Sequence, residues 1–279
     1  MPYKTRKRLF LALAYAVCIT MSAVVLFPFL WTLRTSVMSM HDVMEWPLHY
    51  LPKNITFVNY AYIWKNIQYP RWFLNSVIIG SATALISVII ASLAGYAFAR
   101  FKFPFHKVTL LGILTMNMIP RVLLSIPYYD LMFRLKWLDT YHALIIPYVA
   151  ICLPFATWML ASYFRSIPKD LDECAMVDGA TRLQALFRVV IPLASPGIVA
   201  TGVYCFIVSW CEFLLALTLT SAEEMRTLPV ALSTFVSEFS VDWGLLSAAA
   251  VISTVPVIIM FSYLQKHLIA GLTAGAIKG

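Results

Sequence analysis

Charged residues are scarce in this chain. Of its 279 residues only 12% are Asp, Glu, Lys or Arg, while 61% are hydrophobic and the mean hydropathy is +0.80. Soluble domains carry roughly 25% charged residues, because their surface faces water. The composition therefore excludes a disordered tail, a secreted disulfide scaffold and a water-soluble reader of nucleic acid. It indicates a chain that is surrounded mostly by lipid.

Cysteine and histidine are also rare, with five of each. Four cysteines lie in long apolar runs and Cys174 lies in a charged segment, so we predict no disulfide. The histidines are scattered, without the close spacing of a metal site such as H-E-x-x-H. They are His41, His49, His106, His142 and His267. The sequence therefore predicts neither a metal site nor a catalytic cluster.

A phosphate-binding loop is missing as well. Such a loop needs glycines whose backbone N–H groups surround the phosphate, followed directly by a lysine. The only G-x-x-x-x-G pattern is Gly197–Gly202, and Val203 follows it inside an apolar run. We therefore expect no ATP site on this chain.

Long apolar runs are what the sequence contains instead. A helix needs about 20 apolar residues to cross the roughly 30 Å of hydrocarbon in a bilayer. Six runs predict an all-α, polytopic membrane protein with a single transmembrane domain over residues 1–279. The expected spans are residues 9–33, 72–99, 108–133, 141–164, 196–220 and 244–265. Within the third run, Pro120 and Pro127 are both positioned to break the helix.

The basic residues indicate the orientation of these spans. Thirteen Lys and Arg fall in segments on the same side as the N-terminus, seven fall on the other side, and Arg121 falls within a span. Because cytoplasmic segments are enriched in Lys and Arg, we expect both termini in the cytoplasm. The net charge of +8 then reflects topology, and no nucleic-acid partner is needed to explain it.

Polar residues within the predicted spans are candidates for a substrate path, since a charge in the bilayer usually faces protein or water. The charged ones are Arg121, Asp130 and Glu212. The candidates for contact with a polar cargo are Asn117, Tyr128, Tyr204, Trp210 and Glu212. The alternative is that these side chains pair with one another or with a neighbouring chain and only fix helix packing.

The cytoplasmic segment 165–195 has the pattern of two short helices. We expect Ser166 to cap the first helix and Gly179 to end it in a left-handed conformation. Three acids follow the cap, where the helix dipole favours negative charge, namely Asp170, Asp172 and Glu173. One face of this helix is expected to hold Leu171, Cys174 and Ala175.

A second short helix is expected after Gly179. Its apolar residues have the spacing i, i+3, i+4, i+7, and they are Leu183, Leu186, Phe187 and Val190. Pro192 and Pro196 are expected to close it. The simplest interpretation of periodicity alone is a pair of interfacial helices that rests on lipid headgroups.

The residues of this segment also resemble the EAA loop of ABC-importer permeases. That loop reads EAA, three residues, G, nine residues, I-x-L-P. Here Glu173-Cys174-Ala175, Gly179 and Val189 to Pro192 have the same spacing. The departures, at Cys174, Val189 and Ile191, each keep a small or aliphatic side chain.

Further segments resemble the carbohydrate-importing branch of these permeases, specifically its maltose-permease-G-like subunits. They read GYAFARF (95–101), LDTY (138–141), RSIP (165–168), WCEF (210–213) and GLTAGAIKG (271–279). Cys211 stands where that branch usually has Asn. No residue names the sugar.

The resemblance implies a type I ABC importer permease, with a coupling helix pair between the fourth and fifth spans. The implied partners are a second permease chain in a heterodimer, two copies of a cytoplasmic ATPase, and an extracytoplasmic sugar-binding protein that delivers the sugar. ATP and Mg would bind the ATPase, and this chain would carry no cofactor. The implied location is the bacterial cytoplasmic (inner) membrane.

The resemblance also implies which residues contact the ATPase. In the coupling loop they are Glu173, Ala175, Asp178, Gly179, Ala180 and Pro192, and in the C-terminal tail they are Gly275 and Lys278. The long aromatic outer segment 34–71 either forms an interfacial belt or docks an extracytoplasmic partner. A secondary transporter of a small polar solute is the alternative by composition, but no internal repeat of the kind expected for it is visible.

Overall fold

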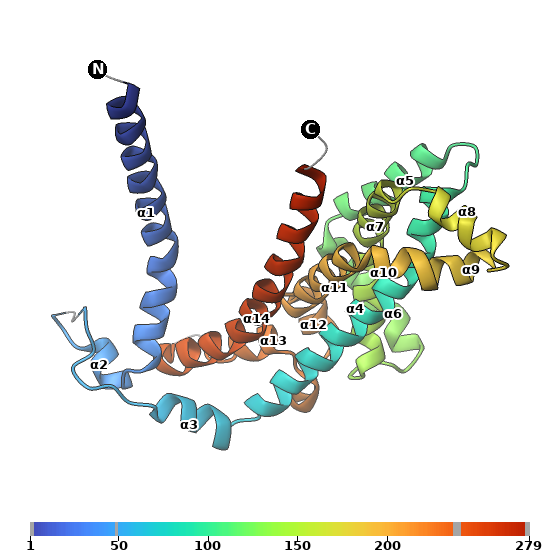
Figure 1. Ribbon diagram of the computed structural model, residues 1–279. Coiled ribbons are helices and arrows are strands. Elements are labelled where there is room, and N and C mark those ends of the chain that lie inside the picture. Colours follow the sequence, from blue (N-terminus) through green and yellow to red (C-terminus); the bar gives the residue numbers. More distant parts are fainter. Residues whose placement is uncertain (1–2, 48–49, 237–240, 277–279) are drawn as a thin grey trace. The chain divides into compact units, whose positions relative to one another are not determined.

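The structure is a computed structural model that describes residues 3–47, 50–236 and 241–276, and it is helical almost throughout (Figure 1). Within these residues the only β pairing is an isolated antiparallel bridge between Val236 and Val241. The predicted all-α fold class is confirmed.

Four helices are long and apolar enough to cross a membrane. They are α1 (Tyr3–Ser36), α4 (Tyr69–Arg100), α7 (Tyr141–Ser166) and α14 (Trp243–Ala276). Two further apolar stretches are bent helix pairs, Val108–Met118 with Arg121–Arg134 (89°) and Arg182–Leu193 with Ser195–Trp210 (84°). If each bent pair counts as one span, the chain has up to six spans, the number predicted from the sequence. The second pair, however, begins within segment 165–195 and not at the predicted start of the fifth span, residue 196.

The third predicted span is broken at one proline and not at the other. It consists of α5 (His106–Thr115), the 3-10 turn η1 (Met116–Met118) and α6 (Arg121–Arg134). Ile119 is extended, with φ −69° and ψ 123°, because the residue before Pro120 is excluded from the helical region. Pro127 lies inside α6, so the expectation that it also breaks the helix is wrong.

The fifth predicted span is likewise not one continuous helix. α11 (Ser195–Trp210) ends before Cys211, and a separate helix α12 (Leu214–Leu219) follows. The Glu212 carboxylate accepts the backbone N–H groups of Leu215 and Ala216, each at 3.1 Å. A carboxylate at this position caps a new helix, which is why the apolar run 196–220 is interrupted.

The remaining helices are short. They are α2 (Met40–Met44), α3 (Val58–Lys65), α8 (Asp170–Val177), α9 (Arg182–Ala185), η2 (Leu186–Val190), α10 (Ile191–Leu193), η3 (Glu223–Met225) and α13 (Leu228–Ser233). The chain divides into two compact units, residues 1–68 with 232–254, and residues 69–231 with 255–279.

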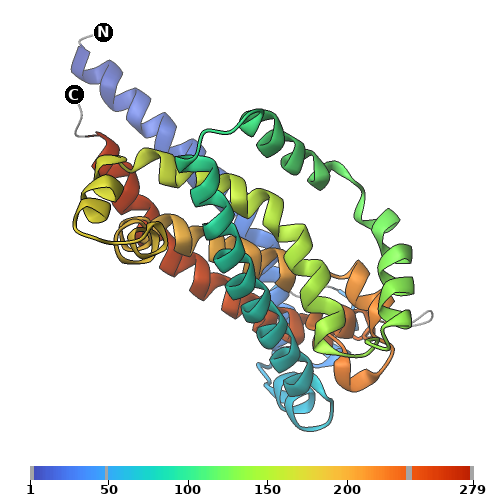
Figure 2. The same ribbon diagram turned by 90° about the vertical axis from the view of Figure 1, so that its right-hand side faces the viewer.

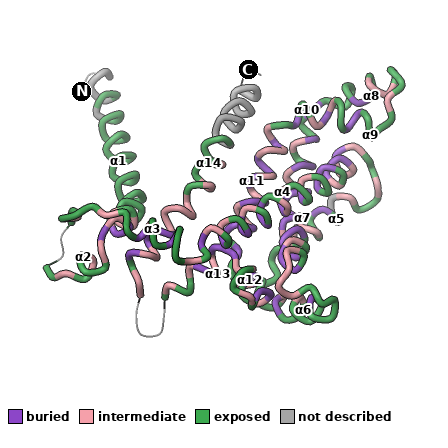
Figure 3. The backbone as a smooth tube through the Cα atoms, turned by 90° about the horizontal axis from the view of Figure 1, so that it is seen from below, coloured by how far each residue is buried: buried purple, intermediate pink, exposed green. Residues whose placement is uncertain are grey.

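In the first unit, the segment after α1 folds back onto the end of that helix. The Asn59 amide donates to the backbone oxygens of Ser36 (3.0 Å) and Met38 (2.8 Å), and the hydroxyls of Ser36 and Tyr60 are 2.7 Å apart. None of the residues in the apolar stretch of α1 is buried, and Figure 3 shows this helix as exposed. The rest of the first unit therefore does not pack around this stretch.

In the second unit, α4, α7 and α11 form the core. α4 and α7 lie side by side along much of their length (Figure 2). Gly95 permits this approach, since a Cβ at this position would lie 2.9 Å from the backbone nitrogen of Ala161. The buried cluster continues through Leu160 and Cys205 to Leu186 and Val190 of segment 165–195.

The segment after α12 is held against α4 by side-chain hydrogen bonds. Trp72 donates from its indole nitrogen to the Glu223 backbone oxygen (2.8 Å), and the Asn75 amide donates to the backbone oxygens of Glu224 (2.7 Å) and Arg226 (3.0 Å). These buried side chains supply donors to backbone oxygens of a segment with little regular structure. The segment is therefore a structured part of the second unit.

Candidate functional site

The first helix of segment 165–195 is α8, and it begins later than predicted. Its first residue is Asp170, and no side chain caps it. Ser166 is instead the last residue of α7, where its hydroxyl donates to the Tyr163 backbone oxygen at 2.7 Å. The cap prediction is wrong, but the three acids do lie in the first turn, where the dipole favours them.

The buried face of α8 also differs from the prediction. Leu171 is 41% exposed and Cys174 is exposed, whereas Asp172 is the buried residue of this helix. Burying a carboxylate is unfavourable unless it is paired and hydrogen-bonded. Asp172 therefore needs a cation from another part of the chain.

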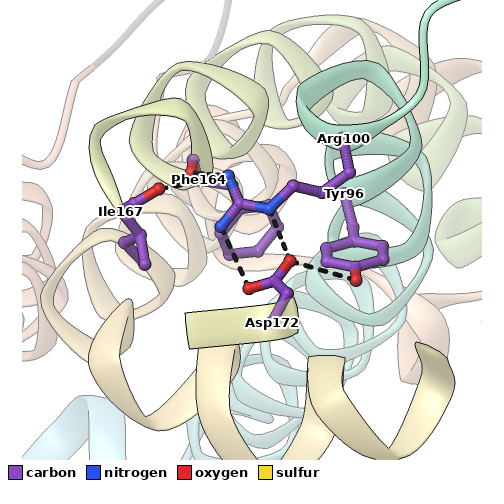
Figure 4. Close-up of polar contacts among 5 residues, drawn as sticks. All are labelled: Tyr96, Arg100, Phe164, Ile167 and Asp172. Atoms are coloured by element: carbon purple, nitrogen blue, oxygen red, sulfur yellow. Dashed lines mark hydrogen bonds and ion pairs between the residues drawn. The ribbon is translucent and has the colours of Figure 1, made fainter. Parts of the chain in front are cut away.

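Arg100, the last residue of α4, supplies that cation (Figure 4). Its Nε lies 2.6 Å from Asp172 Oδ2 and its Nη2 lies 3.2 Å from Oδ1, so the contact is bidentate. The Tyr96 hydroxyl donates to the same carboxylate at 3.2 Å. Both charged side chains are about 95% buried, with exposed fractions of 4% for Arg100 and 5% for Asp172.

The same guanidinium also holds the end of α7. Arg100 Nη1 donates to the backbone oxygens of Phe164 (2.9 Å) and Ile167 (3.1 Å) (Figure 4). Backbone oxygens at a helix C-terminus lack partners within the helix, and a cation near them is favourable. One side chain thereby ties α4, α7 and α8 together.

The turn between α8 and α9 is built as the sequence predicts. Gly179 has φ +91°, a left-handed conformation, which glycine adopts at no steric cost. Its N–H donates to the Met176 oxygen (3.1 Å), and the Ala180 N–H donates to the Ala175 oxygen (3.0 Å). Thr181 then opens α9 in a reciprocal capping box with Gln184, which the sequence analysis did not identify.

The second helix is only partly as predicted. Leu186 and Val190 are fully buried, but Leu183 and Phe187 are exposed, so half of the expected apolar face is buried within this chain. The helix continues from α9 through the π-helical turn η2 and α10, and it ends at Leu193, between Pro192 and Pro196, as predicted.

The two helices enclose an open hollow of about 360 Å³. Ala175, Asp178, Gly179 and Ala180 line it on the α8 side, and Arg188 contributes a positive charge. A second hollow of about 280 Å³ lies beside it, lined by Glu173 and Asp178 among others. The structure therefore brings together five of the six coupling residues expected from the sequence.

The other predicted contact residues lie elsewhere. Pro192 is exposed in α10 and lines neither hollow. Gly275 belongs to α14, but its surroundings are not described, and Lys278 lies outside the described residues. Among the described residues, no group of three or more His, Cys, Asp or Glu is arranged to hold a metal ion.

A separate cavity of about 390 Å³ collects part of the predicted substrate path. Asn117, Tyr128 and Tyr204 line it together with Arg121, and its other lining residues are mainly apolar. These polar groups come from η1, α6 and α11, and the wall opposite them belongs to α7. The cavity thus offers hydrogen-bonding groups inside an otherwise apolar region.

Trp210 and Glu212 do not line this cavity. Trp210 is buried against Phe206 and Phe73, with ring centroids 5.3 Å and 5.7 Å away. Glu212 is buried too, where it caps α12 and accepts the Tyr148 hydroxyl at 2.9 Å. Both side chains make the packing contacts that the alternative interpretation of intramembrane polar residues expects.

The ion pair of Arg100 and Asp172 was not singled out from the sequence. The two residues lie 72 positions apart, so no local spacing links them. The available signal was indirect. Arg100 ends a long apolar helix, and Asp172 lies among the acids of its turn, where the helix dipole alone already accounts for a negative charge.

Comparison with known proteins agrees with this architecture. Residues 87–273 match the family described as "Binding-protein-dependent transport system inner membrane component". A bacterial ABC transporter involved in the import of the acidic polysaccharide alginate has a similar chain, with a TM-score of 0.80 and 25% identity. That match covers 94% of this chain and 97% of the other.

Relatives with known roles are also similar over most of their length. The sulfoquinovosyl glycerol transport system permease protein of Agrobacterium fabrum is 38% identical, over 91% of this chain and 89% of its own. The trehalose/maltose transport system permease protein of Thermococcus litoralis is 38% identical, over 94% of each chain. The permease role predicted from segment 165–195 is confirmed. The chain belongs to the family of inner membrane components of binding-protein-dependent transport systems.

Proposed function

We propose that this chain is one of two permease subunits of an ATP-driven importer for a carbohydrate. The main observation behind the proposal is the α8–α9 pair. It presents Glu173, Asp178 and Gly179 around open hollows, and the buried ion pair of Asp172 with Arg100 fixes α8 to α4. Trehalose and maltose, the cargo in the name of one relative, support a carbohydrate.

The proposed partners complete the transport system of which this chain is a component. A second permease subunit would form the other half of the translocation pathway. Two copies of a cytoplasmic ATPase, which bind ATP and Mg, would each hold a coupling helix pair such as α8–α9. An extracytoplasmic binding protein would dock on the outer segments and deliver the sugar.

The geometry supports a rigid-body mechanism. Closure of the two ATPases on ATP would draw the coupling helices together. Because Arg100 bonds both Asp172 and the end of α7, movement of α8 would be passed to α4 and α7. These helices form the core of the second unit, so the pathway would change from inward-open to outward-open.

The proposed orientation has both termini in the cytoplasm of a bacterial cell, with α8 and α9 on the same side. The chain lies in the inner membrane, as its family description states. The excess of Lys and Arg in the segments assigned to the cytoplasm supports this orientation.

The proposal is tested by purifying the tagged chain from its natural host and reconstituting the complex in proteoliposomes with the binding protein. We expect a second permease and an ATPase to co-purify, and we expect uptake only when ATP is supplied on the ATPase side. Uptake that needs an ion gradient instead of ATP would contradict the proposal.

Two variants at one position probe the coupling turn in that assay. Gly179→Val is expected to lower uptake about tenfold or more, because a β-branched residue is a strained outlier at positive φ. Gly179→Asn is the matched control, since asparagine tolerates the left-handed conformation. Equal uptake by Gly179→Val and the unaltered protein would show that this turn does not couple the ATPase.

A further inference from the structure

Three charged residues lie within the predicted spans, and the structure gives two of them partners. Asp130 pairs with Arg134 on the next turn of α6, at 2.9 Å. Glu212 accepts the Tyr148 hydroxyl and two backbone N–H groups. Arg121 has no hydrogen bond or ion pair with any residue in the described part of the chain. It is therefore the one intramembrane charge among the three that its own subunit leaves uncompensated.

The position of Arg121 at the start of a helix adds to its positive potential. It is the first residue of α6, directly after the 89° bend at Pro120, and it lies near the middle of the predicted third span. A helix N-terminus carries a partial positive charge, which disfavours a cation. No side chain caps this N-terminus. Two sources of positive potential therefore coincide at this bend.

The charge also faces a space that can hold a ligand. Arg121 lines the 390 Å³ cavity together with Asn117, Tyr128 and Tyr204. The amide and the two phenols can donate to or accept from sugar hydroxyls. A guanidinium binds carboxylate and other oxyanions through two parallel hydrogen bonds. The cavity thus combines groups for a sugar ring with one group for an anion.

From this combination we propose that the cargo is an anionic carbohydrate, a sugar with a carboxylate, sulfonate or phosphate group that Arg121 binds during passage. This inference rests on the proposed importer function and names its substrate class. The comparisons allow either class, since relatives include a trehalose/maltose permease and a transporter of an acidic polysaccharide. A neutral sugar would leave the Arg121 charge uncompensated, whereas an anion neutralises it while bound.

The first experiment identifies the cargo. The cognate binding protein is purified without added sugar, its bound carbohydrate is released by denaturation, and mass spectrometry determines the formula and charge. We expect a carbohydrate with at least one acidic group. If the bound carbohydrate is neutral and the unaltered importer takes it up with ATP, the inference of an anionic cargo is wrong and the importer function is supported. If no ATP-driven uptake is observed, the importer function itself is contradicted.

The second experiment tests Arg121 in the reconstituted complex, with the released and radiolabelled carbohydrate as the probe. Arg121→Gln is expected to lower uptake about tenfold or more, and Arg121→Lys is expected to recover most of it, because removing one partner of a charged contact is costly. Arg134→Gln is the matched control, since Arg134 is an exposed arginine of the same helix that does not line the cavity.

Every result of the second experiment decides the role of Arg121. Unchanged uptake by Arg121→Gln would show that Arg121 does not bind the cargo. Failure of both Arg121→Gln and Arg121→Lys to assemble with the second permease would show that Arg121 pairs with an acid of that subunit, and would overturn the inference. Normal assembly with selective loss of uptake in Arg121→Gln, and recovery in Arg121→Lys, would support it.

Discussion

Arg100 and Asp172 show how a single contact can connect the long helices to the coupling segment 165–195. A buried ion pair is weak evidence for stability by itself, because desolvation offsets most of the attraction. This pair is well satisfied, with a bidentate contact, the Tyr96 hydroxyl and two backbone oxygens around the same two side chains. Its geometry therefore suits a rigid connection between α8 and the ends of α4 and α7.

The first prediction concerns loss of this pair. Asp172→Ala leaves the Arg100 charge buried without its partner, which should lower the free energy of unfolding by about 3–5 kcal/mol and reduce ATP-driven uptake. Thermal unfolding of the purified complex and uptake into proteoliposomes measure the two effects. Asp170→Ala is the control, because Asp170 is an exposed acid in the same turn.

A double variant separates a structural role from a coupling role. Replacing both charges, as Arg100→Met with Asp172→Leu, should recover much of the stability, since apolar replacement of a buried pair is often neutral. We expect uptake per ATP hydrolysed to stay low in this variant. Full recovery of uptake would mean that the pair only stabilises the fold. If Asp172→Ala is no less stable than Asp170→Ala, the pair is not formed in the protein.

At the scale of elements, the contact between α4 and α7 depends on a residue without a side chain. A Cβ at Gly95 would lie 2.9 Å from the Ala161 nitrogen and 3.1 Å from the Leu160 Cβ. The Ala161 nitrogen is a backbone atom of α7 and the Leu160 Cβ is fixed to that backbone, so neither can move without shifting the helix. The close approach of the two helices therefore has a specific sequence requirement.

The second prediction follows from that contact. Gly95→Ala should lower the free energy of unfolding by about 1–3 kcal/mol through overpacking. Gly202→Ala is the matched control, because a Cβ there meets only Val88 at 3.6 Å and alanine favours the helix. Thermal unfolding of both variants in the same detergent makes the comparison. Equal stability of the two variants would contradict the tight packing of α4 on α7.

At the scale of the whole molecule, the arrangement of spans belongs to an importer subunit. Four long helices and two bent pairs, together with the match to the family over residues 87–273, decide against the secondary transporter that composition alone allowed.

The third prediction tests the orientation. In a variant whose five cysteines are replaced, Leu51→Cys and Lys102→Cys each place one exposed thiol in a connection on opposite sides of the predicted membrane. A membrane-impermeant maleimide added to spheroplasts should label Leu51→Cys at once, and Lys102→Cys only after permeabilisation. The reverse pattern would place both termini outside.

Two features of the structure could be predicted from the sequence pattern alone. The apolar runs predicted the helices α1, α4, α7 and α14, because burial in lipid requires long apolar stretches. Gly179 was predicted to be left-handed, and it is. Local chemistry decides both features, so both can be read from neighbouring residues.

Other features were decided only by tertiary structure. Asp172 lies within an acidic turn that would face water in isolation, and it is buried because Arg100 reaches it from a helix 72 residues earlier. Glu212 interrupts a continuous apolar run, because its carboxylate caps α12. Likewise, the cavity of Arg121, Asn117, Tyr128 and Tyr204 combines three elements. The sequence by itself determined that the chain spans a membrane as helices and where its charge must meet water. Which charges meet each other was decided by packing, because electrostatic partners depend on distance in space and not on separation along the chain.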